Sequence, residues 1–200
     1  GNPNPPTAAV IGGAKVSDKL AMLENMLSSV QAIFIGGGMS ATFLNAKGYQ
    51  VGSSLMEPEM IEVAVRLEEQ AKEKDVTLLV PQDLVVAERF EPDAPMMTVP
   101  VTQVPNNWVI MDIGPKTSNL FSGKLQQCRT VVWNGPMGVF EMPRFSTGTS
   151  NLAYLLARLD ATTVVGGGST AQAVHDLGLT ARMSHASTGG GASMAFLEGR

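Results

Sequence analysis

The sequence predicts a single α/β domain built on a doubly wound, mainly parallel sheet of six strands. Three observations support this prediction. Short β-branched and apolar runs alternate with helical patterns, these runs are apolar throughout, and most of them end in glycine. In a sheet of this Rossmann-like kind, ligands bind at the carboxyl ends of the strands. The glycine-rich edge is therefore the expected site.

Six segments have the composition of strands buried on both faces. They are rich in Val, Ile and Thr and are bounded by turn residues. Their ranges are 7–13, 31–38, 76–81, 108–114, 130–135 and 162–168. The proline-rich stretch 91–107 predicts an irregular surface excursion. No change of composition divides the chain into two domains.

Four segments are expected to be helices. In 17–30 and 58–74, apolar residues recur at spacings of three and four, which predicts one buried face on each helix. Ser17 suits the N-cap of the first helix, and Pro58 suits the first turn of the second. Two shorter helices are expected at 151–159 and 170–177.

Composition excludes several classes of protein. The 200 residues are 44% hydrophobic and 16% charged, which is typical of a compact globular chain. The net charge of −4 and the lack of Lys and Arg clusters argue against a nucleic-acid partner. No apolar run approaches the roughly 18 residues of a spanning helix, so no membrane partner is expected.

The remaining reactive side chains suggest no metal or redox chemistry. The single cysteine, Cys128, excludes an internal disulfide and is expected to be a buried, inert thiol. His175 and His185 lack metal-ligand spacing and are expected to be structural or surface residues. The start, GNPNPPT, lacks an initiator Met and any signal-peptide pattern. We therefore expect a linker remnant at 1–7 and one domain at 8–200.

Four glycine turns mark the expected binding edge, at 12–13, 36–38, 166–168 and 189–191. Glycine lets backbone N–H groups converge on an anion, although each turn can also be a tight strand-to-helix connection. Four such turns in one chain favour phosphate binding. Two of them match G-x-G-x-x-A, which leaves a dinucleotide-dependent oxidoreductase as an alternative. The acidic residue that such an enzyme needs at the end of a second strand, about 20 residues later, has no clear counterpart after either turn, and a Walker A motif is absent.

Two further stretches carry candidate binding residues. In GGAKVSDKL, Lys15 and Lys19 lie four apart at a helix start, where positive charge opposes the helix dipole. An anion between these lysines and the backbone amides explains them, whereas the alternative is two solvated lysines partly neutralised by Asp18. In WNGPMGVFE, Asn134 offers donors and acceptors, and Glu141 suits ribose hydroxyls. Val139 and Phe140 there suit either the wall of a base pocket or the core.

The motifs GGAKVSDK, IGGGM, DIGP, WNGPMGVFE, VGGG and STGGGAS occur in this order. With them the chain resembles phosphoglycerate kinase, specifically its C-terminal nucleotide-binding domain, over nearly its whole length. The resemblance implies phosphoryl transfer between 1,3-bisphosphoglycerate and MgADP, giving ATP and 3-phosphoglycerate. It places the protein in glycolysis or carbon fixation, in the cytoplasm or the plastid stroma.

The resemblance also implies roles for individual residues. Lys15, Lys19, Gly168 and Gly190 would take part in catalysis by contacting the nucleotide phosphates and the transferring group. The adenosine would lie near the turns at 13–14 and 37–38, the ribose at Glu141 and the phosphates at 167–170. The implied nucleotide-binding residues are Gly13, Ala14, Lys15, Lys19, Gly37, Gly38, Ile110, Asn134, Pro136, Gly138, Val139, Glu141, Gly167, Gly168, Ser169, Thr170 and Gly189.

The chain departs from the family pattern in three ways. The resemblance does not extend to the family's N-terminal substrate-binding domain, which we expect nature or engineering to have separated from this chain. That domain is the expected partner, and the chain alone is not expected to catalyse the reaction. Ser169 stands where the family has the aspartate that contacts magnesium, which leaves a non-catalytic nucleotide-binding module as an alternative. Ile110 stands where the family usually has glycine, which narrows the adenine pocket.

Overall fold

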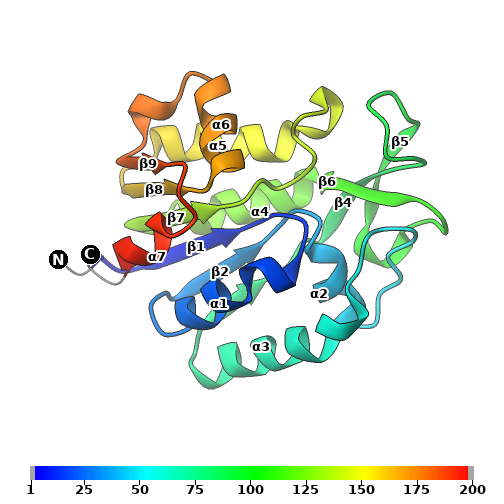
Figure 1. Ribbon diagram of the computed structural model, residues 1–200, viewed down its shortest axis with the longest axis horizontal. Helices are drawn as coiled ribbons and strands as arrows, with labels where there is room; N and C mark the ends of the chain where they lie inside the picture. Colours follow the sequence, from blue (N-terminus) through cyan, green and yellow to red (C-terminus); the bar gives the residue numbers. More distant parts are fainter. Residues whose placement is uncertain (1–2, 198–200) are drawn as a thin grey trace.

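A six-stranded parallel sheet forms the centre of the molecule in the computed structural model, which describes residues 3–197 (Figure 1). The strand order is β3-β2-β1-β7-β8-β9, and every neighbouring pair is parallel. The prediction of a doubly wound, mainly parallel α/β sheet is therefore confirmed. The strands are β1 (Thr7–Ile11), β2 (Ala32–Ile35), β3 (Thr77–Leu79), β7 (Thr130–Asn134), β8 (Thr162–Gly166) and β9 (His185–Ser187).

Helices cover both faces of this sheet, and each face has its own apolar core (Figure 1). Alternate residues of β1 serve the two cores: Ala9 and Ile11 pack on one side, and Ala8 and Val10 on the other. This explains why the strands read as apolar throughout. The first face carries α1 (Val16–Met26), α2 (Ser40–Ala46), α3 (Ile61–Glu73) and α7 (Ala192–Leu197), and the second carries α4 (Pro115–Leu125), α5 (Thr147–Arg158) and α6 (Gly168–Asp176).

One strand predicted for the main sheet belongs instead to a second, antiparallel sheet. It has the order β5-β4-β6 and consists of β4 (Asp83–Ala87), β5 (Met96–Pro100) and β6 (Val109–Ile113). The segment 108–114, predicted for the main sheet, supplies β6, and the excursion 91–107 contains β5 and the 3-10 helix η2 (Val101–Gln103). An apolar run indicates burial but not the sheet it joins. The sixth strand of the main sheet is β9, whose sequence His185–Ser187 contains no apolar run that would have predicted a strand.

The helix boundaries also differ from the predicted ones. Helix α1 begins after Lys15, which is its N-cap, so Ser17 lies inside the first turn. The segment predicted at 58–74 is a 3-10 turn, η1 (Pro58–Met60), followed by α3. Helices α5 and α6 begin at Thr147 and Gly168, earlier than predicted. Helices α2 and α4 were not predicted, and two further 3-10 turns are η3 (Pro143–Phe145) and η4 (Thr180–Arg182).

Several smaller expectations can be compared with the fold. Within residues 3–197, no helix is long and apolar enough to cross a membrane. Cys128 is buried, and burial raises the pKa of its thiol, as expected for an inert cysteine. Strand β1 already begins at Thr7, and the carbonyl of Pro6 accepts a hydrogen bond from Arg129 N (2.9 Å). Residues 1–2 of the expected linker remnant (1–7) and residues 198–200 of the expected domain (8–200) lie outside the described residues.

A buried carboxyl group connects the small sheet to the main body. Asp112 lies on β6, and its two oxygens accept hydrogen bonds from Ile113 N (2.9 Å) and from Gly148 N (2.8 Å) in the first turn of α5. Burial raises the pKa of Asp112 to about 7, and the two backbone donors offset only part of that effect. The folded chain therefore holds a proton here that the unfolded chain releases at lower pH.

Asp112→Asn should change how stability depends on pH. Because the pKa of Asp112 is raised from 3.8 to about 7 in the folded state, its contribution to stability is present below its unfolded pKa and is lost as pH rises through the folded one. The loss amounts to at most about 4 kcal/mol. Urea unfolding of both proteins at several pH values should show a shallower decline for the variant. Parallel curves would show that another group titrates.

Candidate functional site

The carboxyl ends of β1, β2, β7 and β8 surround a cavity of about 330 Å³ that also touches the small sheet. This volume lies within the usual range for small-molecule sites. Ten predicted nucleotide-binding residues line it: Gly13, Ala14, Gly37, Gly38, Ile110, Pro136, Gly138, Val139, Glu141 and Ser169. Phe90 and Met111, which were not predicted, complete the lining.

The glycine turns on the floor of the cavity contact one another directly. Gly13 N donates to the carbonyl of Pro136 (3.2 Å), and Gly37 N donates to the carbonyl of Met137 (3.0 Å). Gly37 has φ +71°, and a Cβ there would lie 2.6 Å from Gly13 N. These glycines are thus required for the packing of neighbouring turns as well as for access to a ligand. The simpler interpretation, tight strand-to-helix turns, accounts for part of the glycine pattern.

One wall of the cavity is apolar. Ile110, Met111 and Val139 line it, and the last two pack in a small core with Phe145 of η3. Phe90 lies at the mouth, 61% exposed, on the connection between β4 and β5. An irregular connection has no hydrophobic period, so no local signal marked Phe90. An aromatic ring beside aliphatic side chains is a suitable surface for a flat base.

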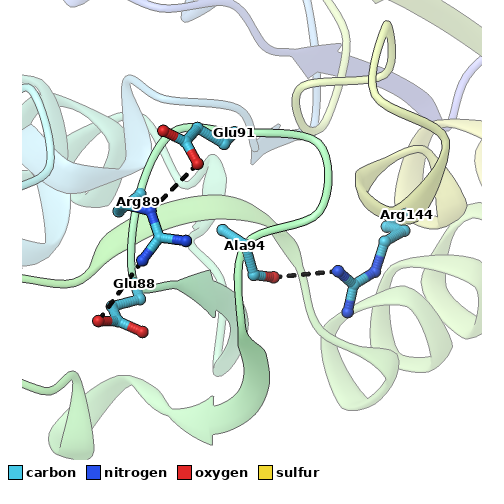
Figure 2. A network of polar contacts seen from close by, with 5 residues as sticks. All are labelled: Glu88, Arg89, Glu91, Ala94 and Arg144. Atoms are coloured by element: carbon cyan, nitrogen blue, oxygen red, sulfur yellow. Dashed lines mark hydrogen bonds and ion pairs between the residues drawn. The ribbon is translucent and has the colours of Figure 1, made fainter.

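The connection that carries Phe90 is attached to the rest of the site (Figure 2). The guanidinium of Arg144, on η3, donates a hydrogen bond to the carbonyl of Ala94 (3.0 Å). Within the connection, Arg89 pairs with Glu88 (3.6 Å) and Glu91 (3.1 Å). These ion pairs are exposed and stabilise little, whereas the Arg144 bond joins the connection that carries Phe90 to η3.

A polar cluster lies beside the cavity. The ammonium of Lys19 donates to Oδ1 of Asn134, whose Nδ2 donates to the carbonyl of Gly190 (3.4 Å). Burial lowers the pKa of Lys19, and the nearby charge of Asp18 offsets part of this effect. A half-buried cation of this kind is stabilised by an incoming anion. The structure thus brings Lys19, Asn134 and Gly190 together, whereas Lys15 is exposed.

The first amides of α1 already have an acceptor. The carboxylate of Glu57 accepts hydrogen bonds from Val16 N (2.7 Å) and Ser17 N (3.3 Å). From sequence we expected a bound anion to accept hydrogen bonds from these amides. In the structure the carboxylate of Glu57 takes that place. No sequence signal marked Glu57, because it lies 41 positions from Val16.

The start of α6 forms the far side of the site. Gly167, with φ +97°, is the N-cap, and Ser169 lines both the main cavity and a neighbouring cleft of about 530 Å³. That cleft also contacts Gly168 and Glu141, together with Phe140, one of the two residues suggested for a base pocket. The hydroxyl of Thr170 is 1% exposed and accepts a hydrogen bond from Gly135 N (2.7 Å). Contact between Thr170 and a phosphate stays a prediction. It requires the hydroxyl to bind the phosphate while it still accepts from Gly135 N.

The last glycine turn and the two histidines can also be located in the structure. Gly189 accepts a hydrogen bond from Gly167 N (3.3 Å), so the last glycine turn adjoins the third. His175 and His185 are both exposed. Among residues 3–197, no three His, Cys, Asp or Glu side chains gather closely enough to hold a metal ion.

Gly37→Ala should lower the free energy of unfolding by roughly 2 kcal/mol or more, because the new Cβ meets backbone atoms of Gly13 and Pro136 at positive φ. Thermal or urea unfolding measures the loss. Gly190→Ala is the matched control, since a Cβ there has no atom within 4 Å, and its effect should stay within about 0.5 kcal/mol. Equal stability of both variants would show that the turns are not tightly packed.

Solved structures of known proteins share this fold. The structure of phosphoglycerate kinase from Coxiella burnetii matches with a TM-score of 0.94 and 45% identity, over 100% of this chain and 52% of that one. The phosphoglycerate kinase of Pyrococcus horikoshii matches with a TM-score of 0.79 and 29% identity, over 98% of this chain and 50% of that one.

Sequence comparison agrees with the structural match. Phosphoglycerate kinases of Moorella thermoacetica and Pelotomaculum thermopropionicum are 49% and 52% identical over 199 residues, which is all of this chain and 51% of each relative. The chain thus spans about half the length of these relatives. A family model described as phosphoglycerate kinase matches residues 1–200. The chain belongs to the phosphoglycerate kinase family.

Proposed function

We propose that this chain binds ADP or ATP along its glycine-lined edge, as the nucleotide-binding half of a phosphoglycerate kinase. The main support is the cavity of about 330 Å³, in which nine predicted residues that follow four strand ends meet Ile110 of β6. Its two sides differ in the way a nucleotide requires. One side is apolar; on the other, Ser169 at the start of α6 lines the cavity, and the Lys19–Asn134 pair lies beside it.

The binding mode follows from this asymmetry. The base lies against Ile110, Met111 and Phe90, with the turns at 13–14 and 37–38 opposite. The carboxylate of Glu141, which lines the same cavity, accepts hydrogen bonds from the ribose hydroxyls. The phosphates then extend toward Ser169 at the start of α6, where a nine-residue helix presents its positive end.

The proposed reaction depends on positioning and charge. Phosphoryl transfer requires aligned groups and positive electrostatics more than covalent chemistry by the protein. Lys19 supplies a half-buried positive charge held by Asn134, and Lys15 supplies an exposed one. The turns at 167–168 and 189–190 adjoin this cluster through Gly167 N and the carbonyl of Gly190.

The oxygen donors at this edge suit a magnesium ion carried by the nucleotide. Ser169 and Glu141 line the cavity together, so the serine hydroxyl can contact an ion held mainly by phosphate oxygens and water. Magnesium, when bound, neutralises and orients phosphate charge. The serine hydroxyl supplies less negative charge than the aspartate that the family resemblance leads us to expect at this position.

The remaining half of the relatives' length is proposed to carry the phosphoglycerate site. This chain spans about half of each relative, and the cavity described above is lined by residues of this half alone. We therefore infer that 1,3-bisphosphoglycerate reacts only when that other part closes on this one. The glycolytic or carbon-fixing role, in the cytoplasm or the plastid stroma, belongs to the same proposal.

Calorimetric titration of the chain with ADP, with excess Mg²⁺ and again with EDTA, tests the proposal. Binding in both conditions, strengthened by Mg²⁺, is the expected result. Equal binding in both would favour the non-catalytic nucleotide-binding module, for which Ser169 is the supporting observation. Enhanced NADH fluorescence on mixing would favour the dinucleotide-dependent oxidoreductase. Absence of ADP binding would contradict the proposal.

Ser169→Asp should strengthen binding of MgADP by about tenfold, because a carboxylate is a harder anionic ligand for magnesium than a hydroxyl. Binding of ADP in EDTA should weaken, since the new charge repels phosphate. Ser169→Asn, of similar size and neutral, is the control and should leave both affinities near those of the original chain. An unchanged MgADP affinity in the aspartate variant would show that position 169 does not face the metal.

A further inference from the structure

We propose that Glu57 is a positioning residue, which holds the lysine-bearing start of α1 where the nucleotide phosphates need it. This inference rests on the proposed function, because it concerns the phosphate end of that site. The observation behind it is a buried carboxylate from a distant loop that caps α1. Neither the residue nor this role followed from the motifs in the sequence.

The contacts of Glu57 account for the first turn of α1. Its Oε1 accepts from Val16 N (2.7 Å) and Ser17 N (3.3 Å), and its Oε2 accepts from the hydroxyl of Ser17 (2.5 Å). Helix N-termini leave amide donors without partners, and the N-cap residue here, Lys15, makes no side-chain cap. Glu57, only 6% exposed, supplies the missing acceptor.

A carboxylate is the appropriate group at this place. Lys15 is the N-cap and Lys19 follows in the next turn, so two cations stand at the positive end of the helix dipole. The buried carboxylate of Glu57 offsets the positive charge of the two lysines and that of the helix N-terminus. Asp18 also lies in the first turn, but it is exposed and therefore screened by solvent. Without Glu57, the first turn loses its acceptors, and the backbone that carries Lys15 loses its anchor.

Glu57 also connects α1 to a second wall of the cavity. Its own N–H donates to the hydroxyl of Thr42 (3.1 Å), a buried residue of α2. Helix α2 begins just after the turn at 36–38, and α1 begins just after the turn at 12–13. One residue therefore fixes the two helices that follow these cavity-lining turns. The distance between Lys19 and the base side of the cavity depends on this connection.

The capping contact determines which groups can reach phosphate. Because the amides of Val16 and Ser17 already bind Glu57, α1 offers the nucleotide its lysine side chains rather than its backbone. Loss of Glu57 has two opposing effects: it removes a negative charge near the phosphates, and it releases the lysines. If positioning dominates, as we propose, removal weakens binding of phosphate-bearing ligands only.

Calorimetric titration of variants with ADP and with adenosine separates these effects. Glu57→Ala should bind ADP at least about tenfold more weakly, while its adenosine affinity stays within about twofold, since only the phosphate end moves. Glu57→Gln should recover most of the ADP affinity, because its amide oxygen can accept from Val16 N and Ser17 N. Glu59→Ala is the matched control: this exposed carboxylate lies two residues away, and its removal should change neither affinity.

Several outcomes would overturn the inference. ADP affinity in Glu57→Ala equal to or tighter than that of the original chain would show that charge repulsion, not positioning, dominates. A parallel loss of ADP and adenosine binding would indicate a general structural role. If Glu57→Ala does not fold, Ser17→Ala decides, with an expected ADP-selective loss of about threefold and a non-selective result overturning the inference. Failure of the unaltered chain to bind ADP would instead contradict the proposed function.

Discussion

The backbone contact between the turns that follow β1, β2 and β7 constrains the rest of the structure. Gly12 N donates to the carbonyl of Asn134, Gly13 N to that of Pro136, and Gly37 N to that of Met137. Such close approach is possible only where side chains are missing, and three of these turns contain a glycine at positive φ. The contact brings the strand ends together, which places the cavity and directs α1 and α2 away from it.

Remote carboxylates then hold the helices that leave this edge. Glu57 caps α1, Asp83 caps α4 through Lys116 N (3.0 Å) and Thr117 N (2.8 Å), and Asp112 binds the first turn of α5. None of these three helices has a side-chain cap from its own N-cap residue. Each acid lies in another element, so every cap also joins two parts of the fold. Buried carboxyl groups that accept hydrogen bonds from helix N-termini thus tie the small sheet and the α2–η1 loop to the main sheet.

Besides the glycine-turn contacts and the carboxyl groups that cap helices, the candidate site has an apolar wall and a polar side. The apolar wall comes from the small sheet and its β4–β5 connection, and Arg144 joins that connection to η3 (Figure 2). The polar side comes from the main sheet, where Lys19, Asn134 and Gly190 converge. The proposed nucleotide, with its base on the apolar side and its phosphates on the polar side, would lie across this junction.

The sequence by itself determined the parallel sheet and the glycine turns, because these depend on patterns a few residues long. Ten of the cavity residues followed from the resemblance of its motifs to the phosphoglycerate kinase family. Only the tertiary structure decided that β6 joins a separate sheet and that β9 completes the main one, since apolar runs do not identify their neighbours. It also decided the positions of Phe90 and Glu57, which reach the site from irregular segments. Thr170 illustrates the same limit, because its hydroxyl binds Gly135 N, 35 positions away. Contacts across such separations arise from the path of the whole chain, which no local pattern records.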